Sequence, residues 1–359
     1  MEVPDKEKYN IRAIIKYAGA FIAWVVGSGF ATGQEILRFF TSYGYASYGV
    51  VLLSLVGFLF IGQVILIKGY EHKGEEKFNH FKFYCGNKLG TVYTWLVSLT
   101  LVLLMSALVS GSGATLSEYY GINHFIGSAI MAIMVLCAYL IGFEKLVKIL
   151  SMIGPVIIIF VFFVGTITVI KDFHYINEVG GYENVLVSVQ SAPNWIISAI
   201  IYLPLNFLCS STYYTALGRS AESKNDAKWG AIVGAIIVVL VITIMNTAIL
   251  LNAGDAASLS VPTLYLAKRI SYVLGAVFSI ALVLGIFSSC STMMWSFCNQ
   301  FFAEGTLENR LFAIATSVVI FIIGLFSFRD LVGIFYPLIG YIGVVFVACV
   351  IYKGIKKAA

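Results

Sequence analysis

The stretch V-G-S-G-F-A-T-G-Q-E-I, residues 26–36, interrupts a long apolar segment near the amino terminus. Three glycines, two hydroxyls, a glutamine and a glutamate stand where a membrane helix normally carries apolar side chains. Backbone groups cannot stay unpaired in lipid, so a helix that breaks at this depth must line a cavity. We expect the stretch to end one half-helix and begin another around a binding site. A glycine-rich packing face is the alternative.

The composition around this stretch is that of a polytopic membrane protein. Hydrophobic residues make up 60% of the chain and charged residues 11%, against roughly 45–50% and 25% in soluble domains. A helix of about 20 residues crosses a bilayer. We therefore predict an all-α integral membrane protein with ten transmembrane helices. The expected spans are 11–41, 46–68, 91–118, 123–143, 147–171, 193–218, 228–252, 270–303, 307–327 and 330–352.

The distribution of lysine and arginine predicts the orientation. The interhelical segments that share a side with both termini carry most of these residues, and positive loops stay in the cytoplasm. We expect a multi-pass protein of the cell (plasma) membrane, in contact with the lipid bilayer, with both termini cytoplasmic. The net charge of +5 then reflects topology, and no nucleic-acid partner is expected. The oligomeric state is not determined by the sequence.

The span count predicts an inverted repeat in one transporter domain. Ten spans divide into halves of five, about 11–171 and 193–352, and an odd number per half gives the second half the opposite topology. Spans one and six then correspond, and span six carries the polar stretch 202–212 around Pro204. We expect helices 1 and 6 to be broken, although a simple proline kink would also explain span six.

Two loops on the side opposite the termini contain short apolar pieces. Residues 182–189 and 262–267 are the clearest examples. We expect both to form interfacial helices that could cap an opening on that side.

Span eight contains hydroxyls at a spacing suited to a small cation. Ser288 and Ser289, with the carbonyl of Gly285 one turn earlier, could present oxygen atoms to a hard ion. Serines that bond back to their own helix are the alternative.

The GSGFATGQE segment, at the start of a chain with ten expected spans, resembles the YkvI-like amino-acid permeases of the amino acid/polyamine/organocation superfamily. The resemblance covers the whole chain by span count and by the placement of the breaks. It implies the five-plus-five inverted-repeat fold of the leucine transporter. In sodium-coupled members, a sodium site takes carbonyls from span one and hydroxyls from span eight. The match implies a Na⁺ site at Ala23, Val26, Gly285, Ser288 and Ser289.

This chain departs from the family pattern in two spans. Span three lacks the tyrosine that holds the substrate carboxylate in some relatives, and offers serines instead. Span six lacks the expected glycine. Both departures concern the identity of the substrate more than the fold.

The leading hypothesis is a secondary symporter of a small amino acid or related zwitterion that works by alternating access and is coupled to Na⁺. The carboxylate would meet backbone amides of residues 29–33, and the ammonium would meet carbonyls near Ser28 and Phe207. Aromatic side chains would form the wall of the pocket. The expected substrate-binding residues are Gly27, Ser28, Gly29, Phe30, Thr32, Gly33, Ser106, Ser110, Tyr202, Asn206, Phe207 and Ser210.

Glu35 and Arg38 are ionisable residues inside a span, and such residues are functional candidates. Their separation of three places them on one helix face. We expect an ion pair with a gating or structural role. The alternative is that Glu35 carries a proton, which would make H⁺ the coupling ion.

A ligand-binding membrane receptor on the same fold is the alternative class of function. The sequence shows no nucleophile with a base, no metal-ligand spacing and no phosphate loop. We therefore expect neither an enzyme nor a bound cofactor.

Overall fold

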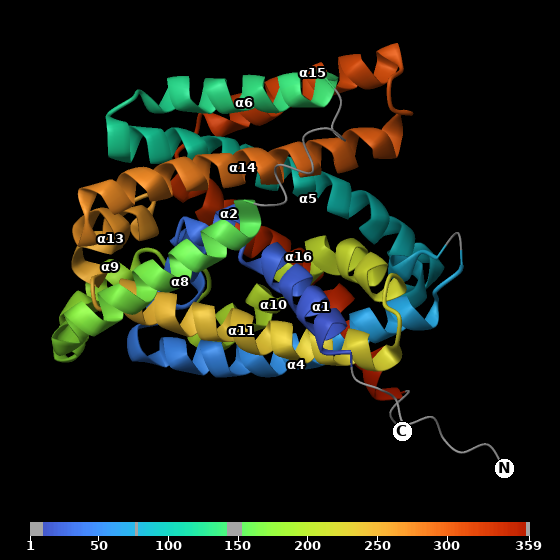
Figure 1. Cartoon of the computed structure of the whole chain (residues 1–359), viewed down its shortest axis with the longest axis horizontal. Helices are drawn as coiled ribbons and strands as arrows, with labels where there is room; N and C mark the ends of the chain where they lie inside the picture. Colours follow the sequence, from blue (N-terminus) through green and yellow to red (C-terminus); the bar gives the residue numbers. More distant parts are fainter. Residues whose placement is uncertain (1–9, 76–77, 142–152, 357–359) are drawn as a thin grey trace.

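The computed structural model describes residues 10–75, 78–141 and 153–356. Every regular element of these residues is a helix, and nine of the helices are long and apolar enough to cross a membrane (Figure 1). The longer helices are α4 (Ser47–Glu71), α5 (His80–Tyr120), α6 (His124–Ile141), α8 (Ile153–Asp172), α10 (Trp195–Arg219), α11 (Lys224–Leu250), α14 (Tyr272–Phe301), α15 (Leu307–Gly324) and α16 (Phe328–Lys356). The shorter helices are α1 (Ile11–Val25), α2 (Ser28–Ala31), α3 (Gln34–Phe39), α9 (Glu183–Val187), α12 (Ala253–Ala256) and α13 (Pro262–Ile270), with the 3-10 segments η1 (Thr41–Ala46) and η2 (Phe173–Tyr182).

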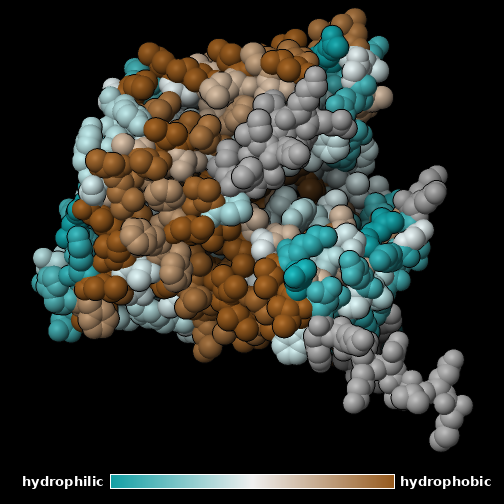
Figure 2. Space-filling model, viewed as in Figure 1, coloured by the Kyte–Doolittle hydropathy of each residue, from teal (hydrophilic) through white to brown (hydrophobic). Residues whose placement is uncertain are grey.

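The surface has the polarity of a membrane-spanning protein. Figure 2 shows apolar side chains over the middle of one face and hydrophilic side chains toward both ends. Large apolar side chains such as Leu52, Trp95 and Ile159 are exposed on the long helices. We call the end where α1 begins and α16 ends the proximal end, and the opposite end, where α13 lies, the distal end (Figure 1). The chain is a multi-pass membrane protein.

The long helices pack into two groups. In the first, α10 and α11 both pack against α4, and α1 packs against α11. In the second, α5 contacts α6, α14 and α15, and α6 also contacts α14 and α15. Helices α8 and α16 contact both groups. Each group thus takes two helices from the first half of the chain and two from the second.

Two small residues allow the closest approach within the first group. Gly69 of α4 faces the backbone of Thr215 and Gly218 on α10, and Gly218 faces the backbone of Leu66 on α4. A side chain at either position would meet the other helix. Small residues permit this kind of contact between membrane helices, where backbones pack directly.

The break expected in span one is confirmed, and the break expected in span six is wrong. Span one forms the three short helices α1, α2 and α3, whereas α10 is one continuous helix that contains Pro204. Proline removes one backbone donor and need not end a helix, and α10 has no glycine near Pro204 to adopt another conformation. The proline alternative therefore describes span six.

The expected interfacial helices are present as α9 and α13. Residues 142–152, where the expected fourth span ends and the fifth begins, lie outside the described residues. The count of ten spans and the inverted repeat stay predictions, because the count requires α1, α2 and α3 to cross the membrane together.

Candidate functional site

The first break lies at Val26 and Gly27. The hydrogen-bond ladder of α1 ends where the Val26 amide donates to the Ile22 carbonyl at 2.8 Å. Gly27 is extended, with φ −81° and ψ −171°. The carbonyls of the last turn of a helix have no partner within it. Ala23 lies in that turn and Val26 caps it, so both carbonyls lie at an interruption, where a cation could use them.

The second break follows within one turn. Thr32 donates through Oγ1 to the Gly29 carbonyl at 2.7 Å, and the Gly33 amide donates to the Phe30 carbonyl at 3.0 Å. The expectation that all amides of residues 29–33 face a ligand is wrong for Ala31 and Gly33, because their amides donate to the carbonyls of Gly27 and Phe30. The Ser28 side chain lies outside the described part of the chain.

The interrupted segment places Glu35 against α10. Tyr202 donates its hydroxyl hydrogen to Glu35 Oε1 at 2.9 Å, and the Asn206 side chain lies close to the same carboxyl group. Glu35 is only 7% exposed. A buried carboxylate is costly unless it is paired, so this group is a candidate to take up a cation or a proton.

The expected ion pair between Glu35 and Arg38 is wrong. Arg38 instead donates from Nη2 to the Arg329 carbonyl at 2.6 Å, and no Glu35–Arg38 pair occurs among the ion pairs of the described residues. Both side chains lie on α3, but neighbouring elements draw them apart: α10 offers a hydroxyl to Glu35, and the start of α16 offers a carbonyl to Arg38. Glu35 therefore belongs with the α10 residues.

The expected α10 residues lie together on a buried part of the helix. The Tyr202 ring lies 5.4, 4.7 and 6.1 Å from the rings of Phe39, Phe40 and Phe58. Asn206 donates from Nδ2 to the Tyr202 carbonyl at 3.1 Å. Phe207 and Phe30 are also buried, and the buried Ser210 hydroxyl has no hydrogen-bond partner among the described residues.

The span-three serines do not join this group. Ser106 donates to the Val102 carbonyl of its own helix at 2.8 Å, and Ser110 donates to the Phe326 carbonyl at 2.7 Å. These contacts do not support a use as substrate ligands, because both hydroxyl groups already donate to a carbonyl. The carbonyl that Ser110 bonds belongs to Phe326, which lies beyond the end of α15. The α5 residue close to the interrupted segment is Leu108, near Gly29.

Sequence reasoning missed Tyr336. Its hydroxyl lies 2.8 Å from the position that a Cβ at Gly29 would occupy, and it is close enough to Glu35 for an electrostatic interaction. The ring is buried. A tyrosine directly before Pro337 inside an apolar span was the available signal. Tyr336 brings α16 into the site.

The expected sodium ligands lie on elements that pack together. Helix α2, which follows the first break, packs against α14. On α14, Gly285 is buried and Ser288 and Ser289 are half-buried. The Thr292 hydroxyl donates to the Ser288 carbonyl at 2.9 Å. These positions are compatible with the expected cation site.

The loop before α13 and the first turn of α13 cover the distal end of the interrupted segment. The Thr263 amide donates to the Thr32 carbonyl at 3.2 Å, and Gln34 Nε2 donates to the Leu259 carbonyl at 2.6 Å. Gly33 has φ +86°, and a Cβ there would lie 2.6 Å from Thr263 Oγ1. The broken helix and the loop therefore fit one another only because residue 33 is glycine.

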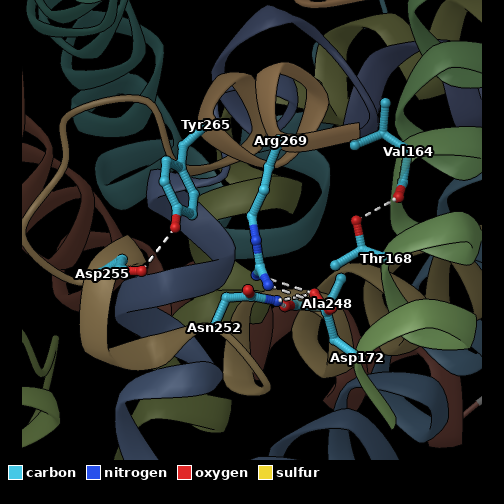
Figure 3. Close-up of polar contacts among 8 residues, drawn as sticks. All are labelled: Val164, Thr168, Asp172, Ala248, Asn252, Asp255, Tyr265 and Arg269. Atoms are coloured by element: carbon cyan, nitrogen blue, oxygen red, sulfur yellow. Dashed lines mark hydrogen bonds and ion pairs between the residues drawn. The ribbon is translucent and has the colours of Figure 1, made fainter. Parts of the chain in front are cut away.

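A polar cluster at the distal end joins α13 to the end of α8 and to the segment between α11 and α12 (Figure 3). Arg269 pairs with Asp172 at 3.0 Å, and Asn252 donates to the same carboxylate at 2.9 Å. Tyr265 donates to Asp255 at 2.6 Å. Burial first, and then the Asp255 carboxylate, raise the pKa of Tyr265 to about 12, so the phenol remains a donor at neutral pH.

Two relatives from Bacillus subtilis (strain 168) match nearly the whole chain. The membrane protein YkvI is 22% identical over 338 residues, which are 94% of this chain and 94% of the relative. The protein YyaD is 20% identical over 340 residues, covering 95% of this chain and 96% of its own. No protein-family model matches the chain.

Solved structures share the architecture. MhsT in complex with L-phenylalanine aligns with a TM-score of 0.57 and 16% identity, covering 90% of this chain and 80% of its own. A variant of the manganese transporter of Eremococcus coleocola aligns with a TM-score of 0.55 and 15% identity, covering 97% and 79%. The fold is that of the leucine-transporter type.

Proposed function

We propose that this chain, which has the leucine-transporter-type fold, is a secondary active transporter that works by alternating access. One observation carries the proposal: the first membrane segment is interrupted at Val26–Gly27 and again at Thr32–Gly33, and the interruption lies between both helix groups. Discontinuous membrane helices of this kind form the substrate and ion sites of many transporters. The relatives aligned above support a transport function of this class and not an enzymatic one.

We assign the substrate to the small amino acids and related zwitterions, in keeping with YkvI-like permeases. The amides that open α2 would receive the carboxylate, since the start of a helix favours negative charge. Because α10 is helical through Phe207, its carbonyl is engaged within the helix. Glu35 and the Asn206 side chain replace it as partners for the ammonium group, and Tyr202, Phe30 and Phe207 form the apolar wall.

Sodium is the first candidate for the coupling ion. The oxygen set would be the carbonyls of Ala23, Val26 and Gly285 with the hydroxyls of Ser288 and Ser289. The end of the α1 ladder at Val26 and the packing of α2 on α14 support it. Hard cations prefer such carbonyl and hydroxyl ligands.

A proton is the second candidate, and the position of Glu35 favours it. The carboxyl group is buried, accepts the Tyr202 hydroxyl and lies close to the Asn206 side chain, with no cationic partner among the described residues. A carboxyl group in such surroundings exchanges a proton more readily than it holds a permanent charge pair. Glu35 would then take up a proton from one side of the membrane and release that proton to the other.

Uptake into proteoliposomes separates these possibilities. We expect labelled small amino acids to accumulate under a Na⁺ gradient and to exchange in counterflow. Ser289→Ala should lower Na⁺-driven uptake about tenfold, whereas Ser296→Ala, at an exposed position of α14, should leave it unchanged. If H⁺ is the coupling ion, uptake follows a pH gradient without Na⁺ and is lost in Glu35→Gln, but not in Glu183→Gln.

Counterflow also tests the receptor alternative. Saturable binding without exchange of labelled substrate would show a receptor and contradict transport. Uptake at the full rate with neither a Na⁺ nor a pH gradient would contradict both coupling assignments while leaving transport itself in place.

A further inference from the structure

A cavity of about 330 Å³ lies at the distal rim, outside the group of residues around Glu35. It lies between the end of α5, the start of α6, the start of α16 and the loop before α13. Its wall includes Ser117, Glu118, His124, Phe125, Ser327 and Phe328. Small-molecule sites begin at about this volume, and none of these residues has a part in the proposed transport site.

Glu118 places a carboxyl group in the wall of the cavity, held by two backbone amides that favour its charged form. Its Oε1 accepts the Ser260 amide at 2.7 Å, and its Oε2 accepts the Val261 amide at 3.2 Å. A carboxylate offers about four acceptor positions, so these two bonds hold the group in place and leave acceptor capacity. Among the ion pairs of the described residues none involves Glu118. A positively charged ligand would supply the missing counter-charge.

His124 adds a second acceptor to the wall. Its Nε2 lies 3.2 Å from both the hydroxyl and the carbonyl of Ser110. Ser110 uses its own hydrogen to bond the Phe326 carbonyl at 2.7 Å, so the Ser110 oxygens can only accept from His124. Nε2 therefore carries the hydrogen, and Nδ1 of the neutral ring is an acceptor. The cavity favours a ligand rich in donors.

The aromatic part of the wall specifies the kind of cation. Phe125 is exposed and Phe328 is buried, and both line the cavity. An aromatic face attracts an ammonium group and also packs against its carbon atoms, whereas a bare metal ion gains little from such a surface. We infer that this cavity binds a small organic ammonium ion, with its charge at Glu118 and its carbon stem against Phe125 and Phe328.

The position of the cavity gives the ligand a means to act on transport. Glu118 holds the loop before α13, which bonds the interrupted helix through Leu259 and leads directly into Thr263 of α13, which bonds it as well. A ligand that bridges Glu118 and the start of α16 would hold this loop in its present position against the interrupted helix. Occupancy would slow opening at the distal end.

Thermal unfolding of the purified full chain tests the site without relying on transport. Ethylammonium chloride is added at constant NaCl, with KCl as the matched salt control. A ligand that binds the native state raises its unfolding temperature, so we expect a saturable rise with ethylammonium alone. Glu118→Gln should weaken the apparent affinity by about tenfold or more, because a charged partner is lost.

Two further variants keep the test decisive. Phe125→Leu, at an exposed ring, should fold normally and weaken the affinity about two- to fivefold. Asp255→Asn, which removes a distal carboxylate outside the cavity, should bind as the unmodified chain does. No saturable rise, an undiminished affinity in Glu118→Gln, or an equal loss in Asp255→Asn would overturn the assignment.

Discussion

Glu35 accepts the Tyr202 hydroxyl, lies close to the neutral Asn206 side chain and is apart from Arg38. A carboxylate next to an arginine would be a stable structural ion pair. A carboxyl group that faces only neutral donors inside the protein can instead change its charge state or its partner during a transport cycle. We therefore assign Glu35 to the proposed substrate site and not to a gating ion pair.

The bond between Tyr202 and Glu35 can be tested by removing one oxygen atom. Tyr202→Phe keeps the ring among Phe39, Phe40 and Phe58 but leaves the carboxyl group without this donor. Hydrogen bonds to charged groups contribute about 1.5–3 kcal/mol. We expect uptake in proteoliposomes to fall about tenfold or more.

Tyr48→Phe is the matched control, because its hydroxyl contacts Thr247 at 3.0 Å in an exposed position. Equal uptake by the two variants would show that the Tyr202 hydroxyl has no special part in transport.

The interrupted first helix and α13 form one unit at the scale of secondary-structure elements. The turn at Gly33 is covered by Pro262 and Thr263, and α13 is in turn fixed to α8 by Asp172 and Arg269. Movement of the distal loop therefore requires a change at the end of α2. This contact connects the proposed substrate site with the distal surface.

Gly33→Ala tests whether this contact is as tight as the structure indicates. The backbone has φ +86° and no room for a Cβ beside Thr263. Gly121→Ala is the control, since Gly121 has φ +69° and no neighbour within 4 Å. The left-handed backbone alone costs about 1–2 kcal/mol, so both variants lose stability in thermal unfolding.

We expect Gly33→Ala to lose more stability than Gly121→Ala and, in addition, to lose uptake. Similar unfolding temperatures and normal uptake in both variants would show that α13 yields easily at Thr263.

At the scale of the whole molecule, two groups of four helices face one another, with α8 and α16 in contact with both. The interrupted helix lies between the two groups, since α2 contacts α14 and α5 while α3 contacts α10 and α11. Such an arrangement allows one group to move against the other while each keeps its own packing. At the distal end the loop before α13 is bonded to the interrupted helix and to Glu118, and α13 is paired with Asp172, so movement there requires these contacts to change.

The orientation of the molecule in the membrane remains a prediction from its lysines and arginines. A green fluorescent protein fused to the carboxyl terminus should fluoresce, because it folds in the cytoplasm. Alkaline phosphatase inserted after the exposed Gly180, in the distal segment η2, should be active, because this enzyme requires an oxidising compartment. The reverse pair of results would place the distal end in the cytoplasm.

The amino-acid sequence by itself determined the class of fold, the helical segments and the break at Val26–Gly27. These features depend on local properties: runs of apolar residues, and glycines beside polar groups where lipid allows no unpaired backbone. The distal helices α9 and α13 could be expected for the same reason.

Only the tertiary structure decided which side chains meet. Pro204 remains inside a continuous α10 because the packing against α4 and α16 supports that helix. Glu35 bonds Tyr202 rather than Arg38, Ser110 bonds the Phe326 carbonyl, and Tyr336 reaches Gly29. Each of these contacts joins residues far apart in the chain, and helix periodicity gives the face of a residue on its own helix but not the neighbour that this face will find.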